Sequence, residues 1–418
     1  MTTLAIEGGT PVRTTALDHR RGVTRIGPEE RDALVEVIGS RSLFRYYGPD
    51  LREKVAGFEA GVRARLDVPH ATATSSGTAA LLAALAAVGV GPGDEVVVPA
   101  VTFIATVNAV VESGAVPIFC DVDASLSLDA SALSASITPR TAAVVPVHLE
   151  NVVADLDGVL AAAVGLPVIE DACQAMGATY HGREAGTIGT MGAFSLQLEK
   201  NITSGEGGVL VTSDEELHWR ALRYTDQGGQ FTTSHGSARG GERDEAFVGT
   251  NLRMNELTGA VAGVQLGRLD AVLAAMRANK AKILDAIGTR PGMQPRAAAD
   301  PAGDGGSSIT WYLPDAQVTG RFVAALSAEG IPCVTMYDGL PVYATPSIMQ
   351  QRTITPKRSP WARHPVPVSY RTGMCPRAED LLARSVTVGV GASYTAADLD
   401  DVAEAVGKVA DAVLGVAG

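Results

Sequence analysis

The sequence predicts an α/β fold with a large, mostly parallel sheet covered by helices on both faces, followed by a smaller C-terminal α+β domain. Through the first two-thirds of the 418 residues, short β-branched runs alternate with helical stretches, which is the pattern of repeated βαβ units. The strand-like runs are continuously apolar, as in strands covered on both faces. The chain also exceeds the roughly 250–300 residues at which single cores stop growing.

The expected elements of the large domain interleave along the chain. We expect strands at 95–98, 116–121, 142–148, 167–171, 193–196 and 209–212. We expect helices at 78–88, 106–112, 153–163 and 214–224.

A change in composition separates the two domains. The stretch 290–308 is rich in Pro and Gly, which break both helical and strand periodicity. We therefore divide the chain into residues 1–289 and 290–418. In the second part we expect a strand at 308–313, a helix at 321–328, a strand near Val334 and a closing helix at 397–413, with a long excursion at 351–368.

Charge and composition exclude several classes of protein. The chain has 46 acidic and 34 basic residues, a formal net charge of -12, so nucleic acid is not an expected partner. The sequence has neither an apolar run of about 20 residues nor a secretion signal, so we expect no membrane partner and a cytoplasmic location. The four cysteines form no C-x-x-C pair, so neither disulfides nor a metal site are expected.

The first informative motif opens the helix expected at 78–88. It reads T-S-S-G-T-A-A-L at 74–81. Free backbone N–H groups and the helix dipole favour a phosphate at such a helix start, and Gly77 lets the main chain approach it closely. Plain Ser/Thr capping of an ordinary helix is the alternative.

The second motif ends a buried strand and reads V-I-E-D-A-C-Q at 168–174. Asp171 lies at the carboxyl edge, where α/β sheets bind ligands. A carboxylate there suits a cationic partner such as a pyridinium nitrogen, and Gln174 could reach an oxygen on the same ring. A helix N-cap after the strand is the other interpretation of Asp171.

The third motif places a lysine between an apolar strand and a glycine-rich turn, A-F-S-L-Q-L-E-K-N-I-T-S-G-E-G-G at 193–208. Desolvation at such a place lowers the pKa of an amine and makes it nucleophilic toward an aldehyde. Lys200 is therefore the candidate catalytic residue. A surface lysine that lays its stem on apolar neighbours is the alternative.

These three motifs, in this order and spacing, resemble the DegT/DnrJ/EryC1/StrS family of sugar aminotransferases. The resemblance covers nearly the whole chain and includes the segments 27–30, 98–106, 145–149, 251–256 and 375–379. The run S-L-Q-x-x-K-x-x-x-S-G-E-G-G at 195–208 is its most specific part. It implies fold type I, a sheet of the seven-stranded type, pyridoxal 5'-phosphate (PLP) as cofactor and a homodimer with shared active sites.

The resemblance also implies a role for each matching residue. Lys200 would form the internal aldimine with the cofactor, Asp171 would pair with the pyridine nitrogen, and Gln174 would contact the ring oxygen. Together they imply a catalytic pair, Lys200 and Asp171.

Five further residues are implied to hold the cofactor. Phe103 would stack on the ring, and Gly77, Thr78 and Ser195 would bind the phosphate together with Asn251 of the neighbouring subunit. From the residues alone, Phe103 could equally be a core aromatic. Ser195 could be a strand hydroxyl bonded to neighbouring main chain.

The chain departs from the family pattern at two places. Glu150 and Asn151 stand where the family usually has an aromatic residue and then glycine, and V-T-V-G-V-G at 386–391 replaces a strand that bears proline and histidine. Both places lie where family members meet their substrates. The departures therefore concern substrate identity and leave the expected cofactor residues intact.

Four residues are candidate substrate contacts. They are His148, Glu150, Arg239 and Arg243. The two arginines belong to H-G-S-A-R-G-G-E-R at 235–243, which could bind a diphosphate or a donor carboxylate or could be a solvated loop. His148 could equally be a structural histidine.

The resemblance implies transamination by a ping-pong mechanism. Glutamate or glutamine would donate the amino group, and a nucleotide-linked keto-sugar or keto-cyclitol would accept it. A PLP-dependent dehydratase, epimerase or lyase is the alternative, although dehydrating relatives generally carry histidine at the position of Lys200. A regulatory subunit that kept only the fold has no physical reason to keep a buried carboxylate and amine.

Overall fold

A computed structural model describes residues 3–229, 246–354, 356–357 and 359–415. Its centre is a sheet made of four strands in the order β1-β9-β8-β5 and three strands in the order β4-β2-β3. The parallel bridges Val144↔Val168 and Val147↔Asp171 join the β5 edge of the first part to the β4 edge of the second. The strands are β1 (His70–Thr74), β2 (Glu95–Pro99), β3 (Val116–Cys120), β4 (Thr141–Val144), β5 (Ile169–Asp171), β8 (Met191–Ser195) and β9 (Gly208–Thr212).

The sheet is mostly parallel, as predicted. β5 pairs with β8, and β2 pairs with β3 and β4, in parallel register. β9 is the exception and runs antiparallel to both β1 and β8. β9 lies directly beside β8, the strand that precedes it along the chain, so the segment that contains Lys200 joins two neighbouring antiparallel strands.

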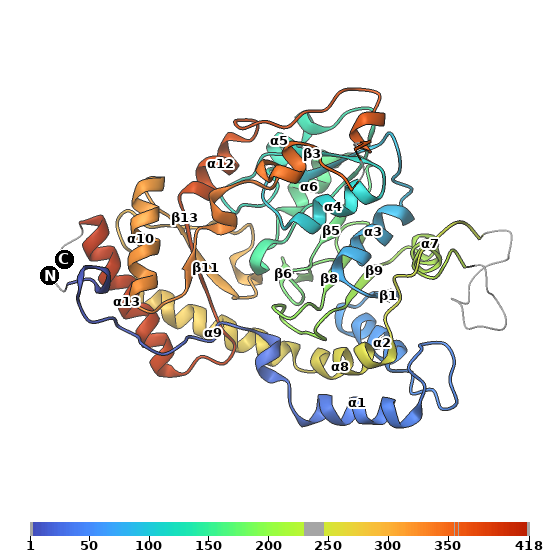
Figure 1. Cartoon of the computed structure of the whole chain (residues 1–418), viewed down its shortest axis with the longest axis horizontal. Coiled ribbons are helices and arrows are strands. Elements are labelled where there is room, and N and C mark those ends of the chain that lie inside the picture. Colours follow the sequence, from blue (N-terminus) through green and yellow to red (C-terminus); the bar gives the residue numbers. More distant parts are fainter. Residues whose placement is uncertain (1–2, 230–245, 355, 358, 416–418) are drawn as a thin grey trace.

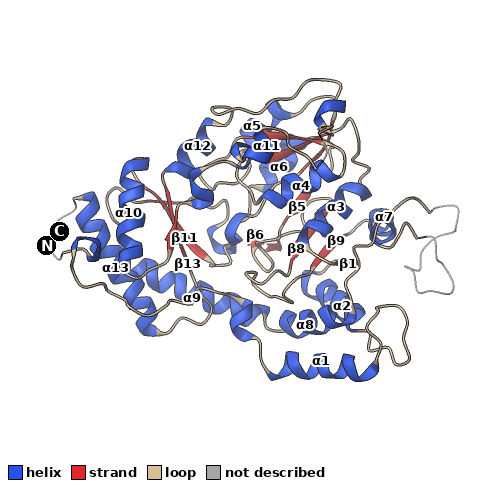
Figure 2. Ribbon diagram, viewed as in Figure 1, coloured by secondary structure: helices blue, strands red, loops and turns tan. Residues whose placement is uncertain are grey.

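Helices cover both faces of this sheet (Figures 1 and 2). Along β9, Leu210 packs into one core while Val209 and Val211 pack into another. Both faces of the strand are therefore buried, which explains its continuously apolar sequence. The helices of this part are α2 (Lys54–Leu66), α3 (Gly77–Ala87), α4 (Ile104–Glu112), α5 (Ala130–Ser136), α6 (Leu156–Ala163), α7 (Glu215–Thr225), α8 (Glu256–Leu266) and α9 (Leu269–Ile287).

Several predicted boundaries were wrong by a few residues. The strand expected at 142–148 ends at Val144, and the strand expected at 167–171 begins at Ile169. The helix expected from 153 begins at Leu156, because the Asp155 side chain accepts a hydrogen bond from Gly158 N and caps the helix there.

A second, antiparallel sheet lies in the C-terminal part, with strand order β10-β11-β13-β12. The expected strand at 308–313 and the closing helix are confirmed. Leu4 and Leu17 of the N-terminal arm join the core of this part. Its elements are β10 (Gln294–Pro295), β11 (Ser308–Tyr312), α10 (Ala316–Ala328), β12 (Cys333–Val334), α11 (Pro346–Met349), α12 (Pro376–Ala383), β13 (Ser385–Gly389) and α13 (Ala396–Leu414).

The expected excursion returns to the large sheet. Tyr343, Trp361 and Tyr370 pack into the core formed by α3, α4 and the sheet. Tyr370 also donates a hydrogen bond to the carbonyl of Pro117, which lies in β3. The predicted domain boundary at residue 290 stays a prediction, because the C-terminal part contributes side chains to both cores.

Among the described residues, no single helix combines the length and apolar character needed to cross a bilayer. One pair of helices, α8 and α9, meets the criterion of length and composition when taken together across a bend of 51°.

Candidate active site

A cavity of about 560 Å³ lies at the carboxyl ends of β5 and β8. It receives side chains from the start of α3, from the end of β5, from the turn after β8 and from the C-terminal part. The lining residues are Ser76, Gly77, Thr78, Leu81, Phe103, Ala105, Thr106, Glu150, Asp171, Cys173, Gln174, Ser195, Gln197, Lys200, Glu206 and Tyr337.

The start of α3 presents unused backbone donors to this cavity. The Ser76 hydroxyl accepts a hydrogen bond from Ala79 N at 3.1 Å, and its carbonyl accepts one from Ala80 N. The first-turn N–H groups of Gly77 and Thr78 have no partner within the helix. With the helix dipole, they form a place for an anion.

Gly77 is required at this helix start by close packing. A Cβ atom at position 77 would lie 2.7 Å from Ser195 Cβ and 2.8 Å from Cys173 Sγ. The helix start can therefore approach the ends of β5 and β8 only because residue 77 has no side chain.

Asp171 ends β5 and is almost fully buried. Its Oδ2 accepts a hydrogen bond from the Thr106 hydroxyl at 2.7 Å, and its Oδ1 accepts one from Cys173 N at 3.1 Å. Within the described ranges no arginine, lysine or histidine forms an ion pair with it. A buried carboxylate without a cation fits a cationic ligand in the cavity.

Lys200 follows β8, and its backbone is fixed on both sides. Its N–H donates to the Gln197 carbonyl at 3.0 Å, and its carbonyl accepts from Gly22 N at 3.2 Å. The Lys200 amine forms neither a hydrogen bond nor an ion pair with any described residue, and it lines the cavity with Asp171. The sequence predicts both residues at the same site, and the structure brings them together.

Gln174 and Tyr337 lie next to each other in the cavity. The Gln174 carbonyl oxygen accepts a hydrogen bond from Glu150 N at 3.1 Å. Burial is the main cause that raises the pKa of Tyr337, and its hydrogen bond with Gln174 opposes that shift. Tyr337 therefore stays a neutral phenol that can donate a hydrogen bond.

Phe103 and Ser195 also line the cavity. The Phe103 side chain is 56% exposed at the start of α4, which excludes an ordinary core aromatic. Ser195 Oγ accepts from Gln197 N at 3.3 Å. It lies against Gly77 at the start of α3, so its hydroxyl can add to the backbone donors there.

The remaining predicted residues lie elsewhere. His148 is fully buried, is bonded to Glu170 and does not line the cavity, which favours the structural interpretation left open by the sequence. Asn251 is exposed and lies outside this chain's own cavity, as expected if it serves a neighbouring subunit. Arg239 and Arg243 lie outside the described residues.

Eight residues that line the cavity were not among the predicted site residues. They are Ser76, Leu81, Ala105, Thr106, Cys173, Gln197, Glu206 and Tyr337. Thr106 and Cys173 lie inside segments quoted for the resemblance, but their contacts with Asp171 depend on the fold. Burial, with the neighbouring Asp171 carboxylate, raises the pKa of the Cys173 thiol well above its ordinary value, so Cys173 remains a thiol.

A helix start for an anion, a buried carboxylate and an unpaired lysine amine together define a site for a phosphorylated cationic ring with an aldehyde. Comparisons with known proteins agree with this class. The model of the DegT/DnrJ/EryC1/StrS aminotransferase family matches residues 25–407. The chain belongs to this family.

Individual relatives are similar along most of the chain. L-glutamine:2-deoxy-scyllo-inosose aminotransferase of Streptomyces fradiae is 34% identical over 430 residues, which cover 97% of each chain. GDP-perosamine synthase of Caulobacter vibrioides is 38% identical over 254 residues, covering 60% of this chain and 65% of that protein. The crystal structure of S. venezuelae DesV in complex with a ketimine intermediate has a TM-score of 0.76, with 31% identity, and covers 92% of this chain and 94% of that one.

The protein is therefore a fold type I, PLP-dependent aminotransferase. Its residues fit the cofactor on two observations of the structure itself. The first-turn N–H groups of Gly77 and Thr78 line the cavity without a partner within the helix, as expected where a main chain binds a phosphate. The Lys200 amine and the Asp171 carboxylate share one cavity, and no ion pair joins them to each other or to another described residue.

Proposed function

We propose that this enzyme moves an amino group from glutamine or glutamate to a ketone carried by a cyclitol or a nucleotide-linked sugar. The observation that carries the proposal is the unpaired Lys200 amine in one cavity with the buried Asp171 carboxylate. The named activity of the S. fradiae relative supports glutamine as donor and a cyclitol as acceptor. The named product of the C. vibrioides relative supports a nucleotide-linked sugar.

Five side chains and two backbone groups would hold PLP. Ser195 and the N–H groups of Gly77 and Thr78 would bind its phosphate. Asp171 would bind the ring nitrogen, and Gln174 the ring oxygen. The two others are Phe103, whose exposed ring would cover one face of the cofactor, and Lys200, whose amine would bond to its aldehyde carbon.

PLP, when bound, supplies an aldehyde that takes up the amino group and a ring that withdraws electrons from the reacting carbon. Asp171, which is buried, would keep the ring nitrogen protonated. Lys200 removes the proton from the α-carbon of the donor as a general base and later returns a proton as a general acid. Thr106 holds the Asp171 carboxylate in place with its hydroxyl.

One cavity serves donor and acceptor in turn, which gives ping-pong kinetics. Glu150 is positioned to contact these substrates, because it lines the cavity beside Gln174 and its side chain is only partly exposed. Its backbone lies in the left-handed region, with φ of 51°, a conformation that costs about 1–3 kcal/mol in a non-glycine residue and concentrates at functional sites.

We further propose that the enzyme works in the cytoplasm as a homodimer. Large apolar side chains are exposed on and around α1 (Pro28–Ser40). They are Ile26, Val35, Ile38, Leu43 and Tyr47. Val35 and Ile38 share one face of the helix at i, i+3 spacing, and a second copy would cover this face. Asn251, exposed and outside its own cavity, would then reach the phosphate of the partner's cofactor.

The visible spectrum of the holoenzyme tests the proposed transfer. Adding glutamine, and separately glutamate, should abolish the absorption band of the bound cofactor and release a 2-oxo acid in equal amount. Adding a keto-cyclitol should then restore the band. A band that is unchanged by every amino donor would overturn transamination and favour the dehydratase, epimerase or lyase alternative.

A matched pair of lysine variants tests the assignment of Lys200. After borohydride reduction, the wild type should carry the cofactor on the peptide that contains Lys200. Lys200→Ala should lose this adduct and, with it, at least about 10⁴-fold in kcat, because it lacks the general acid–base group. Lys282→Ala, on the exposed side of α9, should retain both. A reduced adduct on another lysine would show that the assignment is wrong.

A further inference from the structure

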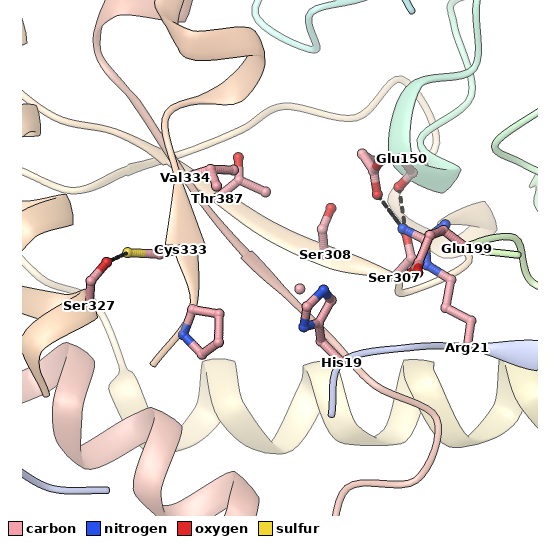
Figure 3. Close-up of a pocket in the computed structure, with 12 residues that line it drawn as sticks. His19, Arg21, Glu150, Glu199, Ser307, Ser308, Ser327, Cys333, Val334 and Thr387 are labelled. Atoms are coloured by element: carbon pink, nitrogen blue, oxygen red, sulfur yellow. Dashed lines mark hydrogen bonds and ion pairs between the residues drawn. The ribbon is translucent and has the colours of Figure 1, made fainter. Parts of the chain in front are cut away.

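A second cavity, of about 370 Å³, shares Glu150 with the cofactor cavity, and Figure 3 shows the side chains that line it. Glu150 lines both cavities, and Glu199 of the second cavity precedes Lys200 of the first. The second cavity is formed by the N-terminal arm and the antiparallel sheet. Its lining residues are His19, Arg21, Glu150, Glu199, Ser307, Ser308, Ser327, Pro332, Cys333, Val334, Thr387 and Gly389.

Several polar groups in this cavity already have partners. Arg21 Nη2 and Glu150 Oε2 form an ion pair at 2.5 Å, at the border with the cofactor cavity. The Ser307 hydroxyl donates to the Glu150 carbonyl at 3.0 Å. The hydroxyls of Thr387 and Thr310 bond to each other at 2.9 Å. These contacts fix the walls of the cavity.

Three other polar groups in the wall have no partner among the described residues. They are the Ser308 hydroxyl, the His19 ring nitrogens and the Glu199 carboxylate. Ser308 is only 5% exposed and lines this cavity, whereas His19 and Glu199 are exposed. A ligand with hydroxyl groups would satisfy all three groups, because a hydroxyl both donates and accepts.

The charges of this cavity disfavour a phosphorylated ligand. Burial pushes the pKa of Glu150 upward, but Arg21, Lys200 and Arg296 together bring it below its ordinary value, so Glu150 is ionised and neutralises Arg21. Glu199 adds a second acidic side chain to the wall. A diphosphate is bound by arginine or lysine side chains. Among the described residues of the wall, Arg21 is the one such side chain, and it is already paired with Glu150.

The size of the cavity also suits a small ligand. Its 370 Å³ lies near the lower end of the roughly 300–1,000 Å³ that small-molecule sites occupy. The cavity can accommodate one six-membered ring with its hydroxyls, and a nucleoside would have to lie elsewhere.

We propose that this second cavity binds an uncharged polyhydroxylated ring, namely the part of the acceptor remote from its ketone. The inference deepens the proposed function and rests on it, because it selects a free cyclitol or sugar over a nucleotide-linked one. Ser308, His19 and Glu199 bind ring hydroxyls. At the border, Arg21 donates and Glu150 accepts, which orients the ketone carbon toward Lys200.

The placement of the departures from the family pattern agrees with this role. Glu150 lies at one departure, and Thr387 and Gly389 lie at the other, yet all three line this one cavity. Gly389 is needed there because a Cβ would come within 3.1 Å of the His19 side chain. The glycine thus makes room for the imidazole beside β13.

Ser308→Val tests the cavity kinetically, because it replaces the unpartnered hydroxyl with an apolar group. With a free inosose (2-keto-inositol) as acceptor, kcat/KM should fall about tenfold through a higher KM, as expected for the loss of a hydrogen bond. The spectral half-reaction with glutamine should be unchanged. Ile309→Val, a change on the opposite face of the same strand, should leave both unchanged. An unaltered KM for the inosose in Ser308→Val would overturn the proposal.

Acceptor preference provides a second test. Wild-type holoenzyme should use the free inosose at least tenfold better, by kcat/KM, than a nucleotide-linked 4-keto-sugar. The reverse preference would overturn the selection of a free ring even if glutamine still reacted, and the proposed transamination would then stand.

Binding of myo-inositol, an unreactive polyol ring, keeps the test independent of catalysis. Saturation-transfer NMR should detect binding to wild type and to Ile309→Val, with a several-fold weaker signal for Ser308→Val. Uridine diphosphate should not displace the ring. Equal binding by all three proteins would contradict the proposal, whether or not the enzyme reacts with glutamine.

Discussion

The two faces of β5 carry neighbouring carboxylates in opposite surroundings. Glu170, fully buried, accepts hydrogen bonds from Gly186 N, Ile188 N and Gly189 N at 2.5–2.7 Å and from His148 Nε2 at 2.8 Å. Asp171, on the other face, accepts one hydrogen bond from a hydroxyl and one from a backbone N–H of the described residues, and it lines the cofactor cavity. A carboxylate has about four acceptor sites. The sites of Glu170 are therefore all used by described donors, whereas some sites of Asp171 are not.

This difference separates a structural carboxylate from a functional one. Burial does not distinguish them, since both are less than a tenth exposed. The number of hydrogen-bond donors to each carboxylate distinguishes them. His148 is one of the donors to Glu170, because its Nδ1 accepts from Ala154 N at 3.3 Å, which leaves Nε2 to donate to Glu170. The same strand therefore has a carboxylate with four hydrogen-bond donors on one face and a carboxylate that lines the cavity on the other.

For the two carboxylates of β5, the largest expected effect is the loss of activity in Asp171→Asn. The amide keeps the shape of the side chain but cannot carry the charge that protonates the cofactor ring, so kcat/KM should fall about 10³-fold, within the range for general acid–base effects. The free energy of unfolding of the apoenzyme, from urea denaturation, should stay within about 1 kcal/mol or rise, because a buried charge is removed. A variant with more than a tenth of wild-type activity would contradict the assignment.

The opposite result is expected for Glu170→Gln. The new NH₂ group would face backbone N–H donors, so the free energy of unfolding should fall by about 3 kcal/mol, while kcat/KM of the folded protein should change less than threefold. Glu216→Gln, an exposed carboxylate in the first turn of α7, should change stability by no more than about 0.5 kcal/mol. A Glu170 variant of normal stability and low activity would erase the distinction between the two faces.

The sequence predicted the fold well where a local pattern carried the information. The apolar runs predicted every strand from β2 to β5 and both strands around Lys200, because burial on both faces leaves a continuous signal. The helix α9 (Leu269–Ile287) was missed although Leu269, Val272, Leu273 and Met276 are buried at helical spacing, so in this case a usable signal was overlooked.

The site was predictable only in part. Motifs identified Lys200, Asp171 and the start of α3, because each lies at a strand end or helix start that its own sequence defines. Thr106 and Tyr337 could not be predicted: Thr106 is 65 residues from Asp171, and Tyr337 comes from the C-terminal part. Their roles depend on how distant segments pack, and no local pattern records that.

Acid titration of stability extends the comparison to histidines. His148 has a carboxylate partner, whereas among the described residues His218 of α7 has a hydrogen bond with the Thr72 hydroxyl and stacks on His70. Burial, aided by positive charge on His70 and Arg63, lowers the pKa of His218 to about 4. The unfolded chain, with an ordinary value near 6.5, binds the proton more readily. The contribution of neutral His218 to the free energy of unfolding is therefore fully present above about pH 6.5, and it is lost as the pH falls toward 4.

The loss should amount to about 1–2 kcal/mol at pH 5 relative to pH 8, allowing for the partly exposed ring. The measurement is the free energy of unfolding of wild type and of His218→Gln at both pH values. The difference between the two proteins should shrink at pH 5, because the variant has no imidazole to protonate. A difference that is the same at both pH values would show that His218 titrates normally.

The smallest effect concerns the hydroxyl that holds Asp171. Thr106 has one proton, which it donates to Asp171, so it must accept from Thr102 at 2.7 Å. Thr106→Val keeps the shape of the side chain and removes one of the two donors to the carboxylate, so kcat/KM should fall about tenfold, as expected for one hydrogen bond to a charged group. Thr106→Ser keeps the hydroxyl and should stay within threefold of wild type. If the two variants were equally impaired, the shape of the side chain rather than its proton would position Asp171, and the number of donors would no longer explain why the two faces of β5 differ.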